Sequence, residues 1–126
     1  MKTKRFNFED LEVWQKSVNF AEKVIASAER INADRKHYRL IEQLEAASAS
    51  VSMNIAEGKG RYSKKEFIQF LYIARGSLFE TITILNIFCR KKWINDIQLD
   101  ELEYFAEEIN KMLSSLIKSI RNSLPL

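Results

Sequence analysis

The chain has 126 residues, 46% of them hydrophobic and 29% charged, with three Gly, one Pro and a net charge of +3. This length fits one domain with a sizeable core, and so few turn-forming residues exclude a β-sandwich or barrel. The single Cys89 and the single His37 exclude an internal disulfide and a metal site built from Cys or paired His, so we expect no cofactor. A lone thiol and an N-terminus without a signal peptide favour the cytoplasm.

Apolar residues recur every three or four positions in the first half of the chain, which predicts two helices. The first spans about residues 8–31, with Asn7 as its N-cap. The second spans about residues 35–58 and begins near Asp34. It ends at Gly58-Lys59-Gly60, where glycines suit a helix C-terminus.

The second half of the chain predicts two more helices. The third spans about residues 64–91 with Ser63 as its cap, and the fourth spans about 96–122 with Asn95 and Gln98 as a cap pair. The third helix is apolar on more than one side, so it must either lie centrally or also meet another subunit. Polar interruptions in it argue against a membrane span.

Four long helices joined by short connections favour an all-α, single-domain, up-down-up-down four-helix bundle with antiparallel neighbours. The start of the first and third helices and the end of the second and fourth then share one end of the bundle. Basic residues near these positions are Lys2, Lys4, Arg5, Lys59, Arg61, Lys64, Lys65, Lys118 and Arg121. Acidic residues there are Glu9, Asp10, Glu57 and Glu66. We hypothesise that this end binds nucleic-acid phosphate, and solvated surface charge is the alternative.

The first half of the fourth helix has the opposite charge. Residues 95–110 contain Asp and Glu but no Lys or Arg, and they are predicted to lie toward the other end of the bundle. We therefore expect a molecule whose small net charge conceals a basic end and an acidic end.

A polar seam follows the second helix beside its apolar stripe, and polar residues also interrupt the third helix. The polar residues of interest are Gln43, Asn54, Glu57, Ser77 and Glu80. They could form a buried network that fixes the helix register, a polar interface between subunits, or a catalytic pair of carboxylates. The network is favoured, because no nucleophile, metal-ligand set or phosphate loop accompanies the carboxylates.

Three stretches of the chain resemble the four-helix-bundle family of 23S ribosomal RNA intervening-sequence proteins. They are Phe8–Lys16 (FEDLEVWQK), Asn54–Gly58 (NIAEG), and Phe67, Phe70 and Leu71 followed by Ala74–Glu80 (ARGSLFE). The resemblance covers about residues 8–120. It implies a left-handed antiparallel bundle, a ring-like homopentamer, a bacterial source and no enzymatic activity. A related accessory protein of diversity-generating retroelements associates with nucleic acid and reverse transcriptase.

One departure from the family concerns two arginines that commonly follow Gln-Leu in the second helix. This chain has Glu45 and Ala46 at those positions. If the arginines contact RNA or balance the carboxylates of the polar seam, this chain lacks that role. Glu57 and Glu80 are then left without an obvious cation, unless Arg75 or Arg61 substitutes.

These observations together predict a non-enzymatic, self-associating cytoplasmic protein that binds RNA or DNA. The residues expected to bind nucleic acid are Lys4, Arg5, Lys59, Arg61, Lys64, Lys65 and Arg121. A structural or adaptor protein that binds another protein, such as one that processes nucleic acid, is the alternative. An enzyme that uses Asn54, Glu57 and Glu80 in a cleft is a third interpretation.

Overall fold

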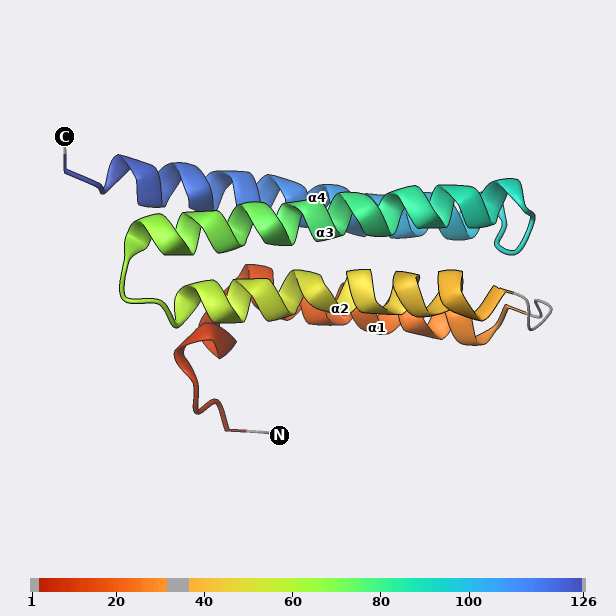
Figure 1. Cartoon of the computed structure of the whole chain (residues 1–126), viewed down its shortest axis with the longest axis horizontal. Coiled ribbons are helices and arrows are strands. Elements are labelled where there is room, and N and C mark those ends of the chain that lie inside the picture. Colours follow the sequence, from red (N-terminus) through yellow and green to blue (C-terminus); the bar gives the residue numbers. More distant parts are fainter. Residues whose placement is uncertain (1–2, 32–36, 126) are drawn as a thin grey trace.

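Four antiparallel helices run the length of the molecule, with α1 and α2 packed together below α3 and α4 in Figure 1. This computed structural model describes residues 3–31 and 37–125. The elements are the 3-10 turn η1 (Asn7–Asp10) and the helices α1 (Glu12–Glu29), α2 (Tyr38–Lys59), α3 (Lys64–Arg90) and α4 (Asp96–Asn122). Each helix packs against the next and α4 also packs against α1, which confirms the up-down bundle. Its left-handedness stays a prediction.

The core is a stack of apolar side chains that all four helices supply. The largest fully buried ones include Phe20, Leu44, Ile55, Leu71, Leu78, Leu85, Phe88, Ile109 and Leu113. In α3, Leu71, Leu78 and Leu85 recur every seven residues, which keeps one stripe against the core along the helix. Burying each such side chain contributes about 1.5–3 kcal/mol, so the apolar spacing decides which face of each helix points inward.

Helix α3 buries a wide face, as the sequence predicts for a helix that is apolar on more than one side. Ile84 and Phe88 are almost completely buried, since α3 packs against both α2 and α4. Ile73, on the same apolar stripe, is 51% exposed, and Phe79 is 52% exposed. An apolar strip therefore remains on the outside of α3. None of the described helices is long and apolar enough to span a bilayer.

The first helix begins later than the sequence predicts, and Asn7 does not cap it. Asn7 instead opens η1, and α1 starts at Glu12 after Leu11, which makes no side-chain cap. The cause is Glu9, whose Oε1 accepts the backbone N–H of Phe6 at 3.1 Å and of Arg5 at 3.3 Å. These bonds hold a separate turn ahead of the helix.

The other helix ends test the remaining cap predictions. Helix α2 begins at Tyr38, and the predicted start at Asp34 lies outside the described residues. Ser63 caps α3, because its Oγ accepts the N–H of Glu66 at 3.3 Å. Asn95 and Gln98 form the predicted cap pair of α4, each side chain accepting the other's backbone N–H at 2.8 Å.

Candidate nucleic-acid interface

The basic end is the end of the bundle where η1, the connection between α2 and α3, and the last turn of α4 meet (Figure 1). Its described basic residues are Lys4, Arg5, Lys59, Arg61, Lys64, Lys65, Lys118 and Arg121. The Nζ of Lys64 donates a hydrogen bond to Ser123 Oγ at 3.1 Å, which ties the start of α3 to the end of α4. Lys2 lies outside the described residues. The fold thus brings cations from distant stretches of the chain together, as the bundle topology predicts.

A tight corner between α2 and α3 forms the middle of the basic end. Gly58 is buried where α2 crosses α3, and an added Cβ there would lie 2.7 Å from the Cβ of Phe70 and 2.8 Å from Cδ1 of Phe67. Gly60, the C-cap of α2, has an ordinary helical φ of −78°. Gly58 is therefore the glycine that this corner requires. It is required because α2 and α3 pack closely there, and not because of its backbone conformation.

The cations of this corner rest on aromatic rings instead of pairing with carboxylates. The guanidinium carbon of Arg61 lies 4.7 Å from the Phe70 ring centre, and the Nζ of Lys59 lies 5.9 Å from that of Phe67. Cation–π contacts leave the charge available to an anion. In the described part of the chain, no Asp or Glu forms a salt bridge with Arg61, Lys64 or Lys65.

A second cluster of cations surrounds Tyr72 on α3. Nη2 of Arg121 donates to the Tyr72 hydroxyl at 2.7 Å, and the Arg75 guanidinium lies 4.9 Å from the ring centre. The hydrogen bond from Arg121, more than the charges of Arg121 and Arg75, lowers the pKa of Tyr72. The sequence indicates Arg121 but not Tyr72, although Tyr72 lies one turn before Arg75 on α3.

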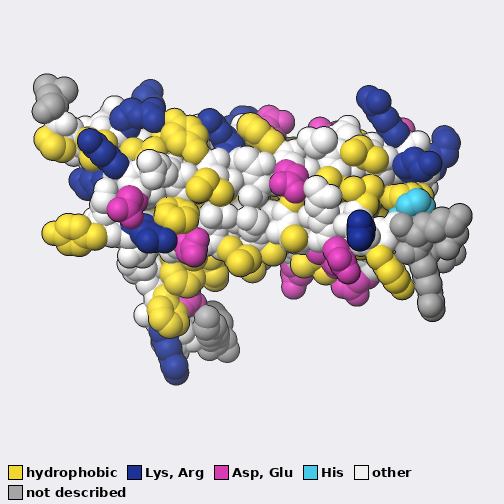
Figure 2. Space-filling view, viewed as in Figure 1, with side chains coloured by type: hydrophobic (Ala, Val, Ile, Leu, Met, Phe, Trp, Pro, Cys, Tyr) yellow, Lys and Arg dark blue, Asp and Glu magenta, His cyan; other side chains and the backbone are white. Residues whose placement is uncertain are grey.

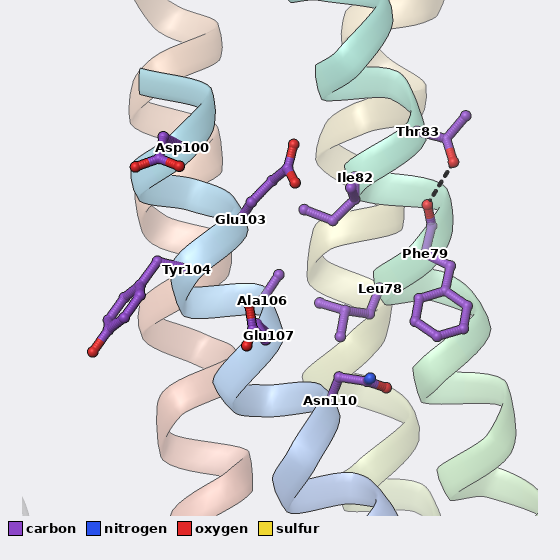
Figure 3. Close-up of a pocket in the computed structure, with 10 residues that line it drawn as sticks. All are labelled: Leu78, Phe79, Ile82, Thr83, Asp100, Glu103, Tyr104, Ala106, Glu107 and Asn110. Atoms are coloured by element: carbon purple, nitrogen blue, oxygen red, sulfur yellow. Dashed lines mark hydrogen bonds between the residues drawn. The ribbon is translucent and has the colours of Figure 1, made fainter. Parts of the chain in front are cut away.

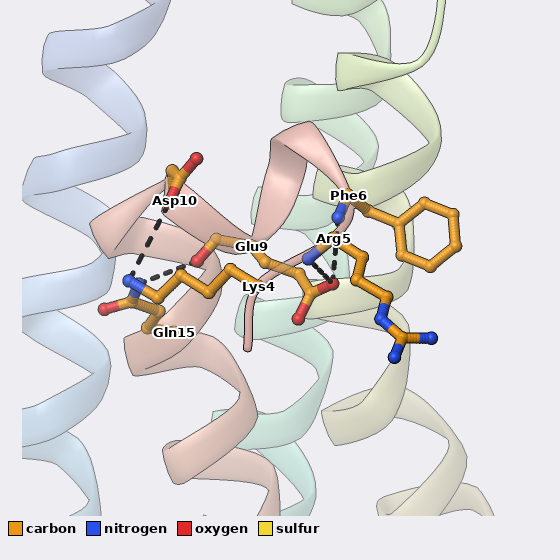
Figure 4. Close-up of polar contacts among 6 residues, drawn as sticks. All are labelled: Lys4, Arg5, Phe6, Glu9, Asp10 and Gln15. Carbon is orange, nitrogen blue, oxygen red and sulfur yellow. Dashed lines mark hydrogen bonds and ion pairs between the residues drawn. The ribbon is translucent and has the colours of Figure 1, made fainter. Parts of the chain in front are cut away.

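The N-terminal cations are weaker candidates, as Figure 4 shows. The Nζ of Lys4 lies 3.8 Å from Oδ1 of Asp10, and the backbone N–H of Arg5 is bonded to Glu9. The carboxylate of Asp10 partly neutralises Lys4, and Glu9 is buried beside the same turn. Among the residues expected to bind nucleic acid, Arg61, Lys64 and Lys65 are exposed and form no salt bridge in the described part of the chain.

The opposite end of the bundle is less acidic than the sequence predicts. Figure 2 shows Lys and Arg side chains at both ends of this face. The exposed basic residues that the fold brings to the far end are Arg30, Arg39, Arg90, Lys91 and Lys92. They share that end with the acidic first turns of α4, so the expected contrast between a basic and an acidic end is reduced.

The polar seam lies mostly at the outer edge of the contact between α2 and α3. Ser77 Oγ donates to Ser50 Oγ at 3.0 Å, and Asn54 Nδ2 donates to the carbonyl and the hydroxyl of Ser50, both at 2.8 Å. These three residues are half-buried and form a small network. The interpretation as a buried network holds only for this part of the seam.

The expectation of burial is wrong for Gln43, Glu57 and Glu80, which are exposed. The inner face of α2 is filled by its apolar stripe, so longer polar side chains beside that stripe turn outward to water. Gln43 Nε2 donates to Glu80 Oε2 at 3.4 Å across the seam. An interface between subunits remains the interpretation that these exposed residues allow.

In the described part of the chain, neither Arg61 nor Arg75 pairs with a carboxylate of the polar seam. Arg61 and Arg75 lie on aromatic rings, and neither forms a salt bridge with Glu57 or Glu80 in the described part of the chain. Neither arginine therefore substitutes as a partner for these two carboxylates. The carboxylates need no such partner, because water solvates them.

A groove between α3 and α4 is lined by acidic side chains, in contrast to the basic end (Figure 3). It encloses about 500 Å³, and its lining includes Phe79, Ile82, Asp100, Glu103 and Glu107. Its carboxylates repel phosphate, so this side of the bundle disfavours a nucleic acid. Among the described residues, no three His, Cys, Asp or Glu side chains are grouped as a metal site.

Comparisons with known proteins point to one family. The model of the family described as "23S rRNA-intervening sequence protein" matches residues 9–115. A crystal structure of a protein with unknown function from the S23 ribosomal protein family of Bacteroides thetaiotaomicron superposes with a TM-score of 0.78 at 29% identity. The superposition covers 84% of this chain and 98% of that one. A search of curated proteins found no match.

Proposed function

The chain belongs to the 23S rRNA-intervening sequence protein family, and from this premise we propose that it binds nucleic acid, RNA foremost, at the basic end. The function is binding without catalysis. The observation that carries this proposal is the group of exposed cations at Arg61, Lys64 and Lys65, none of which pairs with a carboxylate in the described part of the chain.

The physical basis is the release of counterions from the phosphate backbone. The affinity falls as salt rises. Each phosphate that a Lys or Arg neutralises makes the slope of log affinity against log salt more negative, by about 0.9 for a duplex and by about 0.7 for a single strand. Arg61 is already oriented by its contact with Phe70, and the start of α3 is tied to α4 through Lys64. A rigid corner loses little conformational entropy when phosphates bind.

The test is a matched pair of charge reversals. The first variant carries Arg61→Glu, Lys64→Glu and Lys65→Glu. The control carries Arg39→Glu, Arg90→Glu and Lys91→Glu at the far end, which changes the net charge by the same amount. Fluorescence anisotropy with a labelled RNA of about 20 nucleotides is read from about 50 to about 200 mM KCl.

Reversal at the basic end is expected to abolish binding at low salt, while the far-end control keeps a measurable affinity and the wild-type salt slope. Equal losses in both variants would mean that net charge alone governs binding. Unchanged binding in the basic-end variant would rule out the corner as the site. If the chain is instead an adaptor that binds another protein, we expect no salt-dependent binding of RNA.

Self-association is a second proposal, supported by the apolar strip on the outside of α2 and α3. Met53, Ile73, Phe79 and Ile87 are each more than 40% exposed. Large apolar side chains exposed on neighbouring helices are candidates for contact with another subunit. Light scattering after size exclusion is expected to show an oligomer, and the family resemblance implies a pentamer. Ile73→Glu should dissociate it, and a monomeric wild type at micromolar concentration would refute the interface.

A further inference from the structure

Tyr62 lies in the connection between α2 and α3, at the centre of the basic end. Its side chain is 106% exposed, the highest value among the large hydrophobic residues that the structure describes. A ring with this exposure contributes nothing to the core, so packing gives no reason for an aromatic residue here. Its neighbours in the chain are Arg61 and Ser63, and Lys64 follows.

Three aromatic rings of α3 near this end are already covered by cations, and Phe6 beside η1 is stacked on Phe8 with the ring centres 5.8 Å apart. Phe67, Phe70 and Tyr72 each have a Lys or Arg group 4.7–5.9 Å from the ring centre. No described ring or cation contacts Tyr62, so both faces of its ring are open to solvent. Tyr62 therefore offers an aromatic ring without a ring or cation partner, next to Arg61 and Lys64 in the chain.

We propose that Tyr62 stacks on an unpaired nucleobase, so that the basic end prefers single-stranded over double-stranded nucleic acid; this rests on the proposed function. Aromatic stacking accepts any base, because every base has a π face. Bases inside a duplex are already stacked on their neighbours and cannot reach the ring without unpairing. Arg61, Lys64 and Lys65 bind the flanking phosphates while Tyr62 takes the base.

The expected size of the effect follows from base–aromatic stacking, which is worth about 1–3 kcal/mol per base. Tyr62→Ala should therefore weaken binding of a single-stranded RNA by about 5- to 150-fold, since about 1.4 kcal/mol is a factor of ten. The salt slope should stay at the wild-type value, because no phosphate contact is lost. Tyr62→Phe should bind as the wild type does.

The experiment measures anisotropy of labelled single-stranded RNA, single-stranded DNA of the same sequence, and the blunt duplex of each. Tyr104→Ala is the matched control, since Tyr104 is also an exposed tyrosine, 67% exposed, but lies beside the acidic groove. The wild type should prefer both single strands to both duplexes. Tyr62→Ala should remove that preference and Tyr104→Ala should keep it.

Three results would overturn the stacking role. They are equal affinity of Tyr62→Ala and the wild type, equal affinity of the wild type for single strands and duplexes, and no binding by the wild type. The first two, combined with loss of binding in the Arg61, Lys64 and Lys65 reversal, refute the stacking role and leave the proposed function standing. The third refutes both.

Discussion

Gly58 sets the corner that presents the basic end, and replacing it with alanine tests that role. A Cβ at this position would lie 2.7 Å from the Cβ of Phe70 and 3.3 Å from the carbonyl oxygen of Phe67. Neither atom is the end of a flexible side chain, so α2 and α3 must separate. Overpacking of this kind costs about 1–3 kcal/mol, and alanine returns up to about 1 kcal/mol of helix propensity.

The net expectation for Gly58→Ala is a loss of up to about 2 kcal/mol, which for a chain of this length lowers Tm by up to about 10 °C. Gly76→Ala is the matched control, because Gly76 lies within α3 and no atom would come within 4 Å of an added Cβ. There the gain in helix propensity should raise stability by about 0.5–1 kcal/mol.

The assay is thermal and urea unfolding followed by circular dichroism, at one protein concentration and with the oligomeric state checked by light scattering for each variant. The two substitutions should move Tm in opposite directions. If Gly58→Ala were as stable as Gly76→Ala, α2 and α3 would not approach closely at this corner. The account of how Arg61 and Lys64 are positioned would then be wrong.

Three further predictions concern single contacts. Asn95→Ala should remove the N-cap of α4 and cost about 1 kcal/mol in urea unfolding, whereas an unchanged midpoint would show that the cap pair contributes nothing. Arg121→Ala should raise the pKa of Tyr72 toward its ordinary value, because the hydrogen bond that favours the ionised phenol is lost; phenolate absorbance against pH measures this, and no shift would contradict the contact. The hydrogen bond from Cys89 to Asp96 raises the pKa of the thiol, so Asp96→Asn should lower it and speed alkylation of Cys89 near pH 8, while an equal rate would argue against the bond.

The sequence predicts most of the fold, because heptad spacing and caps act locally. Ser63 and Asn95 are polar side chains that stand directly before the first residues of α3 and α4, and each caps its helix as predicted. Asn7 has the same appearance and fails. There the carboxylate of Glu9 accepts the backbone N–H groups of Arg5 and Phe6 and holds a 3-10 turn ahead of the helix.

The site is less predictable, because it depends on how helices sit against one another. Helical spacing places Gln43, Glu57 and Glu80 beside the apolar stripe, but it does not tell whether that edge points inward or outward. The exposure of these three residues follows from the close packing of α2 on α3. Gly58 makes that packing possible, and its clash distances are visible only in three dimensions.

The most direct test of the basic end is cross-linking of a photoactivatable RNA to the wild-type protein, followed by mass spectrometry of the adducts. We expect cross-links within residues 59–65 and at the end of α4, near Arg121. We expect none in the acidic groove at residues 100–107. Cross-links concentrated at residues 90–92 would place nucleic acid at the opposite end of the bundle and contradict the account.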